Sequence, residues 1–319
     1  MADVPDRVHT WVAAREQHRR NGDLSAADAL RQRIAGAGYE VTDTPDGPVV
    51  AAARRWQPVA AGDVANRLDA EAEHDLSVLL LLDVYGLEAE PAWLVEDATR
   101  CLASVLEHLA PHRFEVCILD NGVGGAAGAW AADAARNPGI SALHLGEPVG
   151  FNTARALQHR AAMGRVLLWL DTGVTLDGDV AGRLLDVFAD PEVGLAGRWG
   201  ADLSSSIYEF TAVEPPTTGL TDVHAVWGYL LGLRRELLRS GAVALDEGFD
   251  FYRNADAELS FRVRAAGART VLADLPAVQH VHRGFTETPA STVERESRRN
   301  YQRLLERWRG EMRTLAAGR

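Results

Sequence analysis

A regular alternation of strand-like and helix-like segments, running from Leu76 to Asp190, constrains the fold more than any other feature of this chain. Apolar runs such as LSVLLLLDV, FEVCILD and RVLLWLD have the length of buried strands, and amphipathic segments such as WLVEDATRCLASVLEHL separate them. Strands that alternate with helices of this length form a mainly parallel sheet with helices on both faces. We therefore predict an α/β protein with a Rossmann-like sheet.

Carboxylates follow three of these predicted strands. Asp83, Asp120 and Asp171 each stand where an apolar run ends, and Asn121 comes directly after the second of them. One such acid is usually an ordinary loop residue, but ligands of open α/β sheets bind at the carboxyl ends of the strands. Three acids in register therefore predict a binding site at one edge of the sheet. No G-x-G-x-x-G follows the first strand, which disfavours a dinucleotide-binding fold.

The composition excludes several classes of function. All 33 basic residues are arginine, so Schiff-base chemistry on lysine and a lysine-bearing P-loop are excluded. A net charge of -12 argues against a general nucleic-acid binder. No apolar run is long enough for a membrane span, and MADVPDRVHTW lacks the apolar core of a signal peptide, so we expect a cytoplasmic protein. Cys101 and Cys117 are expected to be buried and unpaired.

The chain is expected to consist of four parts. Two helical patterns with a turn at Asn21-Gly22-Asp23, an N-cap candidate at Ser25 and a short ribbon predict a small helical hairpin module at the N-terminus. A polar, alanine-rich connector follows it, and an amphipathic, arginine-rich helix ends the chain. That helix is expected to pack on the domain, with a membrane surface or a second subunit as alternatives. The predicted boundaries are 1–56 for the module, 57–74 for the linker, 75–287 for the α/β domain and 288–319 for the C-terminal helix.

The stretch REQHRRNGDLSAADALRQRIAGAGYEVTDTPDGP resembles the C-terminal piece of cysteinyl-tRNA synthetases. The catalytic signatures and zinc cysteines of those enzymes are absent, so the resemblance implies a borrowed module. Eight acidic and eight basic residues through Arg55 give no support to tRNA binding. We expect a docking or structural role, with an RNA-associated protein as an alternative.

From Leu76 to Gly284 the order of motifs resembles that of family 2 glycosyltransferases, which are inverting enzymes with a GT-A fold that use nucleotide-diphosphate sugars. LLLLDVYG, ILDNG, GEPVGFNTARALQHRAAMG, VLLWLDTGV and WGYLLGLRRELL stand in the order of that family's motifs. The resemblance implies a GT-A-like fold and the following nucleotide-sugar-binding residues: Asp83, Tyr85, Asp120, Asn121, Phe151, Asn152, Arg155, Asp171 and Gly228.

The family's D-x-D motif is altered in this chain. The first aspartate of that motif contacts the nucleotide and the last binds a divalent metal, whereas the chain has Asp171-Thr172-Gly173. Asp177 and Asp179 precede a predicted helix, where capping accounts for them. The resemblance implies manganese or magnesium held by Asp171, with His282 as the candidate for the distal ligand. Two alternatives are open: His280 and His282 close an edge strand, or arginine neutralises the diphosphate without a metal.

The candidate catalytic base lies in RNADAELSFRVRAAG, which resembles the family's helix with a glutamate-aspartate pair. Ala255-Asp256 keeps the second acid of that pair. An inverting transfer needs one carboxylate to take the acceptor's proton, and Asp256 suits this role, with Glu258 in reserve and helix capping as the alternative. Trp227 and Tyr229 alternate in a predicted strand and suit either sugar stacking or the core.

These observations predict a glycosyltransferase that moves a sugar from a nucleotide-diphosphate donor to an unidentified acceptor with inversion. A divalent metal is its expected cofactor, and the donor and the acceptor are its expected partners, without general nucleic-acid binding or a membrane span. Gly173 and Ala255 leave open a non-catalytic relative that binds a nucleotide sugar or a partner protein.

Overall fold

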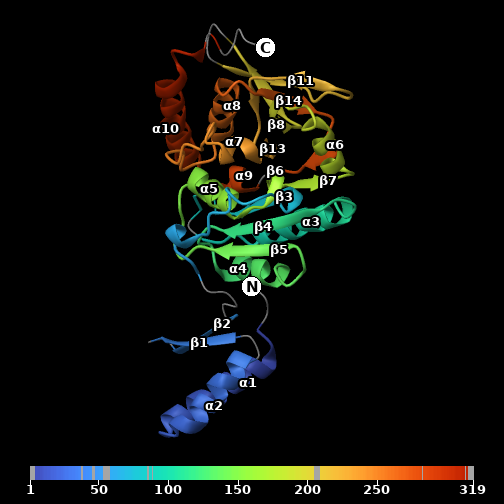
Figure 1. Cartoon of the computed structure of the whole chain (residues 1–319). Coiled ribbons are helices and arrows are strands. Elements are labelled where there is room, and N and C mark those ends of the chain that lie inside the picture. The colour runs from blue at the N-terminus through green and yellow to red at the C-terminus, as the bar shows by residue number, and fades with distance from the viewer. Residues whose placement is uncertain are drawn as a thin grey trace.

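An eight-stranded sheet forms the centre of the computed structural model (Figure 1), which describes residues 4–36, 39–44, 47–52, 58–84, 86–87, 89–204, 209–281, 283–312 and 314. The strand order is β11-β14-β8-β13-β6-β3-β4-β5. The β6, β3, β4 and β5 strands are parallel to their neighbours in this group, and so are β14 and β8, whereas β13 is antiparallel to both β6 and β8. The predicted α/β fold with a mainly parallel sheet is confirmed. The strands are β3 His74–Leu82, β4 Phe114–Asp120, β5 Ile140–His144, β6 Gly164–Leu170, β8 Val193–Gly197, β11 Leu220–Asp222, β13 Leu230–Arg234 and β14 Arg269–Ala273.

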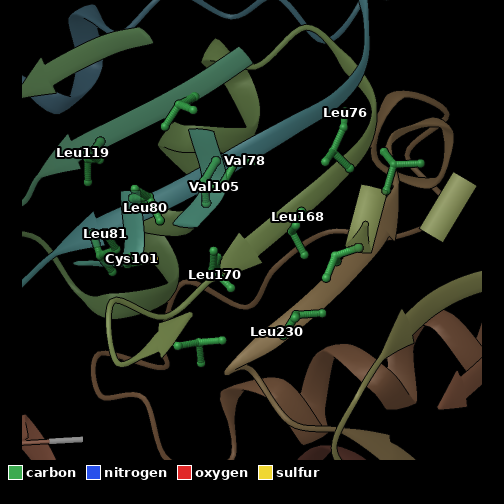
Figure 2. Close-up of a cluster of buried hydrophobic side chains, with 14 of the residues drawn as sticks. Leu76, Val78, Leu80, Leu81, Cys101, Val105, Leu119, Leu168, Leu170 and Leu230 are labelled. Carbon is green, nitrogen blue, oxygen red and sulfur yellow. The ribbon is translucent and has the colours of Figure 1, made fainter. Parts of the chain in front are cut away.

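Apolar clusters cover the two faces of this sheet, because successive side chains of a strand point to opposite sides. Leu80 and Leu168 belong to one cluster together with Val105 of a helix between β3 and β4 (Figure 2). Leu79 and Leu167 belong to the other cluster. The helices of this domain are α3 Trp93–His108, α4 Gly125–Ala134, α5 Phe151–Ala161, α6 Val180–Val187, α7 Arg235–Arg239, α8 Ala255–Ala265, α9 Arg283–Glu287 and α10 Ala290–Trp308.

Short strands extend the domain beyond the central sheet. β9 (Gly200–Leu203) pairs with β10 (Phe210–Val213) and with β12 (Ala225–Val226). β7 (Val174–Leu176) pairs with β15 (Ala277–Gln279), so the segment after β6 is tied to the segment that precedes α9.

The cysteines behave as predicted. Cys101 in α3 and Cys117 in β4 are buried, free thiols. Burial raises the pKa of both, that of Cys117 to about 12, so neither is a ready nucleophile at neutral pH.

The N-terminal part has its own small core. The helices α1 (Asp6–Arg20) and α2 (Leu24–Gly36) and the antiparallel strands β1 (Tyr39–Thr44) and β2 (Gly47–Ala52) lie at one end of the molecule (Figure 1). Val8, Val12, Ile34 and Val41 are buried together. This arrangement matches the predicted helices and ribbon.

One detail of that prediction was wrong, namely the N-cap at Ser25. The helix α2 already begins at Leu24, and the Oδ1 atom of Asp23 accepts a hydrogen bond of 3.1 Å from the backbone amide of Ala26. A carboxylate therefore satisfies the first turn of the helix, and Ser25 lies inside it.

The connector before β3 includes a 3-10 turn, Ala61–Asp63, and is hydrogen-bonded to the α/β domain. The amide of Val59 donates to the carbonyl of His144 at 2.8 Å, and that of Arg67 donates to the carbonyl of Arg160 at 2.6 Å. Residues 58–73 are thus fixed along the domain surface. The domain boundaries themselves stay a prediction.

The C-terminal helix α10 packs on the domain, as expected. Its residues Asn300, Leu304 and Trp308 are buried, and the ring of Trp308 contacts Phe261 of α8 at 5.8 Å between centroids. Figure 1 shows α10 beside α8. Within the described ranges, none of the helices combines the length and the apolar character needed to cross a bilayer.

Candidate active site

The three acids predicted to share one edge of the sheet do so. Asp83 follows β3, Asp120 ends β4 and Asp171 follows β6, and these three strands are parallel neighbours. Their carboxyl ends therefore meet at one edge, as expected for an open α/β sheet.

The antiparallel strand β13 brings a second chain segment to this edge. Because it runs opposite to β6, its first residue Leu230 lies beside Leu170, the last residue of β6. The amide of Asp171 donates to the carbonyl of Tyr229 at 2.9 Å. The predicted strand through Trp227 and Tyr229 was wrong, since both lie in the connection between β12 and β13.

A cavity of about 320 Å³ opens where these segments meet. Five of the predicted site residues line it, namely Phe151, Arg155, Asp171, Gly228 and Asp256. The lining also includes Trp227 and Tyr229, although Tyr229 packs against the core as well, and Tyr252, Arg253 and Asn254, which the sequence did not single out. The signal available for the last three was their position directly before the predicted base.

Arg155 of α5 forms one wall of the cavity. Only 6% of this residue is exposed, and its guanidinium carbon lies 4.4 Å from the ring centroid of Phe151 and 4.9 Å from that of Trp169. Its Nη2 atom donates to the carbonyl of Gly228 at 3.4 Å. A Cβ atom at residue 228 would meet that Nη2 atom at 2.9 Å, so glycine permits this close approach.

Asp256 lies in the first turn of α8 and is half-buried. Its Oδ2 atom accepts a hydrogen bond of 2.9 Å from the amide of Gly228, and its Oδ1 atom accepts one of 2.9 Å from the amide of Ala257. Burial raises the pKa of Asp256 above its ordinary value, although the Gly228 amide and Arg155 act in the opposite direction. A carboxylate with a raised pKa is a stronger base than an exposed one.

Glu258, the reserve base, lies elsewhere on the same helix. It is fully buried, forms an ion pair with Arg262, and is absent from the described lining of the cavity. Burial raises its pKa, and the charge of Arg262 opposes that rise. The structure thus separates the two acids, and Asp256 alone of the pair faces the cavity.

The altered D-x-D segment makes a tight local turn. The Oδ1 atom of Asp171 accepts a hydrogen bond of 2.7 Å from the amide of Gly173. The carbonyl of Gly173 in turn accepts a hydrogen bond of 2.8 Å from the amide of His280. Asp179 caps α6 by accepting a 2.7 Å bond from the amide of Gly182, which confirms the capping interpretation for Asp179. Asp177 is exposed and is absent from the described cavity lining.

Asp120 and Asn121 hold loops and are absent from the described cavity lining. Asp120 is 1% exposed, and its Oδ1 atom accepts a 2.8 Å bond from the amide of Val123. The Nδ2 atom of Asn121 donates to Oδ2 of Asp83 at 2.8 Å, and its Oδ1 atom accepts from the amide of Val149 at 2.9 Å. The implied contact of these residues with a nucleotide stays a prediction.

Asn152 is fully buried in α5, and its Nδ2 atom donates to the carbonyl of Asp246 at 3.0 Å. Asp83 is half-buried beside Asn121. Neither is among the described residues that line the cavity. Tyr85 and His282 lie outside the residues that the structure describes.

The predicted strand through His280 and His282 was also wrong for its described part, since β15 ends at Gln279. The Nε2 atom of His280 lies 3.0 Å from Oγ1 of Thr175. Among the described residues, no three histidine, cysteine or acidic side chains cluster in a way that could hold a metal. Asp171 is the carboxylate of the altered motif that lines the cavity, and its role as a metal ligand stays a prediction.

Comparisons with known proteins bear on this site. Residues 96–211 match the model of glycosyl transferase family 2, and residues 1–48 match that of the cysteinyl-tRNA ligase anticodon binding domain. Both resemblances seen in the sequence are thus confirmed over these ranges. The first match covers the segments that carry Phe151, Arg155 and Asp171.

A solved structure agrees with the fold. The crystal structure of GalNAc-T7 with UDP, GalNAc and Mn²⁺ is similar to this chain with a TM-score of 0.59 and 16% identity. The match covers 75% of this chain but 49% of that protein, so this chain corresponds to about half of it. At this identity the likeness establishes the GT-A-like fold.

Proposed function

From the family 2 match and the geometry of the cavity, we propose that this protein transfers a sugar from a nucleotide-diphosphate donor to an acceptor hydroxyl, with inversion. The observation that carries the proposal is the convergence of Asp171, Arg155 and Asp256 on one cavity at the carboxyl ends of the strands. In this proposal, Asp171 supplies a carboxylate on the donor side, Arg155 supplies a positive charge and Asp256 supplies the base.

In the proposed reaction, the acceptor oxygen attacks C1 of the sugar from the face opposite the diphosphate. Asp256 takes the proton of the acceptor hydroxyl as the new C–O bond forms and the bond from C1 to the diphosphate oxygen breaks. The diphosphate leaves with the electron pair of that bond. The amide of Gly228 holds the Asp256 carboxylate in place through its 2.9 Å hydrogen bond.

Arg155 and Asp171 are proposed to act on the donor side. The guanidinium of Arg155 is stacked on two aromatic rings, which fixes its direction before any ligand arrives. Trp227, Tyr229 and Tyr252 provide aromatic faces on which a sugar or a base can stack.

The residues present fit a divalent ion that the donor phosphates hold in large part. Magnesium in such sites needs only one or two protein carboxylates, and Asp171 at the cavity is one. A bound ion would neutralise charge on the departing diphosphate. His282 as a further ligand stays a proposal, as does the donor-binding role of Asp83, Tyr85, Asp120, Asn121 and Asn152.

A specific observation supports a second candidate, a non-catalytic protein that binds a nucleotide sugar. Gly173 stands where the motif has its metal-binding aspartate, and Ala255 stands where the family has the first acid of its acidic pair.

The N-terminal module is proposed to be a docking or structural unit. An RNA-associated role is the alternative for this module, since its family model is an anticodon binding domain.

Titration calorimetry with a panel of uridine, guanosine and thymidine diphosphate sugars, with and without manganese, tests the proposal. We expect one donor class to bind and the wild-type protein to hydrolyse or transfer that sugar. Donor binding without any turnover would favour the non-catalytic candidate. Failure to bind every donor in the panel would contradict both.

A further inference from the structure

The segment between α7 and α8 carries the part of the cavity wall that the sequence did not predict. Residues 246–254 contain no helix or strand, yet Tyr252, Arg253 and Asn254 at their end line the cavity. The first turn of α8, with Asp256, follows at once. The direction of this segment therefore decides where the proposed base stands.

Asn300 of α10 reaches this segment from outside the cavity. The side chain is fully buried, and its Nδ2 atom donates two hydrogen bonds, to the carbonyls of Phe251 at 2.7 Å and of Arg253 at 2.8 Å. The two carbonyls flank Tyr252. A single amide group thus fixes two peptide units just before the base, and asparagine can do this because its NH₂ group has two donors.

Ion pairs and a second amide hold the other end of the segment. Nη2 of Arg303 donates to Oδ1 of Asp246 at 2.6 Å, and Nε donates to Oδ2 at 3.1 Å. Asn152 of α5 donates to the carbonyl of Asp246. The segment is therefore held between α5, which carries Arg155, and α10.

The backbone at the helix start shows why such support matters. Asn254 has a φ of 64°, in the left-handed region, and its side chain does not cap α8. Asparagine adopts this conformation more readily than most residues with a side chain, but the conformation still costs free energy that the surrounding structure must offset. The second hydrogen bond from Asn300 goes to the carbonyl of Arg253, which directly precedes Asn254.

We infer that Asn300 is a positioning residue, which sets the direction of residues 251–254 and through them the place of Asp256 in the cavity. The inference rests on the proposed function for its catalytic part. The Asp256 carboxylate must meet an acceptor hydroxyl within hydrogen-bond reach, and a displacement of about 1 Å is enough to lower a rate by about a hundredfold. Loss of the Asn300 amide should thus affect the transfer step more than donor binding.

The test compares Asn300→Leu, which is similar in size but lacks both donors, with Arg298→Ala. Arg298 is an exposed residue of the same helix whose guanidinium pairs with Glu294, so it is a matched control. Each purified full-length variant is examined by amide hydrogen exchange, by calorimetry with the donor that the wild type binds, and by single-turnover transfer. Asn300→Ser, which is smaller, serves if the leucine variant does not fold.

We expect faster exchange in Asn300→Leu confined to residues 250–257, with β3 and β4 as protected as in the wild type. Donor affinity should stay within about threefold, while the transfer rate falls by about 10- to 100-fold. Arg298→Ala should match the wild type in all three measurements. A uniform rise in exchange over the whole domain, or an unchanged transfer rate despite faster local exchange, would overturn the inference.

Hydrogen exchange separates this inference from the proposed function. If the wild type neither binds nor transfers any donor, the proposed function fails, yet faster exchange confined to residues 250–257 still supports the positioning of the segment. Unchanged exchange in those residues overturns the inference, whatever the activity.

Discussion

The backbone amide of Gly228 donates a 2.9 Å hydrogen bond to Oδ2 of Asp256, which joins the connection before β13 to the first turn of α8. The carbonyl of the same glycine accepts a bond from Arg155 of α5. One residue without a side chain therefore links the proposed base to the proposed donor-binding arginine. Substitutions of Asp256 and of Asp171, which also lines the cavity, test the proposed site.

Replacement of Asp256 by asparagine should separate transfer from donor binding. The asparagine side chain would keep the size of the aspartate but could not accept a proton, and positioned acid-base groups contribute about 10² to 10⁴-fold to rates. We expect single-turnover transfer to fall by at least about a hundredfold with donor affinity near that of the wild type. Glu258→Gln on the same helix is the comparison and should have a smaller effect, since Glu258 pairs with Arg262. Full activity of Asp256→Asn would assign the base to another group.

The raised pKa of Asp256 predicts both a rate profile and a stability profile. A carboxyl group acts as a base only when it is ionised. The transfer rate should therefore rise with pH, with a midpoint above the pKa of an exposed aspartate. A carboxyl group whose pKa is raised on folding stabilises the protein at low pH, and that contribution is lost as pH rises through the raised value. The stability of the wild type relative to Asp256→Asn should therefore decrease from acidic to neutral pH. Thermal unfolding of both proteins across this pH range measures their difference in stability. If the wild type instead became more stable relative to Asp256→Asn as the pH rises, the pKa of Asp256 would be lowered on folding and the prediction would be wrong.

Replacement of Asp171 by alanine should abolish donor binding, because it removes the carboxylate that the altered motif presents to the cavity. Asp177→Ala, six residues further on, is the matched control, since Asp177 is exposed and absent from the described cavity lining. Calorimetry with the donor and manganese measures both variants. Gly173→Asp should strengthen the dependence of binding on manganese by adding a second carboxylate. Unchanged donor affinity in a folded Asp171→Ala protein would rule out the proposed site.

Removal of residues 1–57 should leave donor affinity within a few fold of the full-length value. The N-terminal part has a core of its own, and the truncation keeps Val59, which is hydrogen-bonded to the domain. Circular dichroism establishes folding and calorimetry measures donor affinity. A folded truncated protein without any donor affinity would contradict the separate role of this module.

The sequence by itself determined the parts of this protein that depend on local patterns. Apolar runs predicted the strands β3, β4 and β6 because a buried strand needs a continuous apolar stretch, and the acids after them mark one edge because parallel strands end together. The resemblance of RNADAELSFRVRAAG to the helix of family 2 glycosyltransferases predicted α8 with Asp256 near its start. Gly173 was likewise readable as a departure from the family motif.

Only the tertiary structure decided which of these residues share a cavity. Asp120 and Asn121 are absent from the described cavity lining, and their polar atoms bond to Val123, Asp83 and Val149, while their contact with a nucleotide stays a prediction. The antiparallel direction of β13 placed Trp227 and Tyr229 at the edge, whereas their alternation suggested a strand. Asn300 fixes a segment almost fifty residues earlier in the chain. Hydrogen bonds between such distant residues depend on how the elements pack, and a periodic pattern within one element records its own buried face but not its partners.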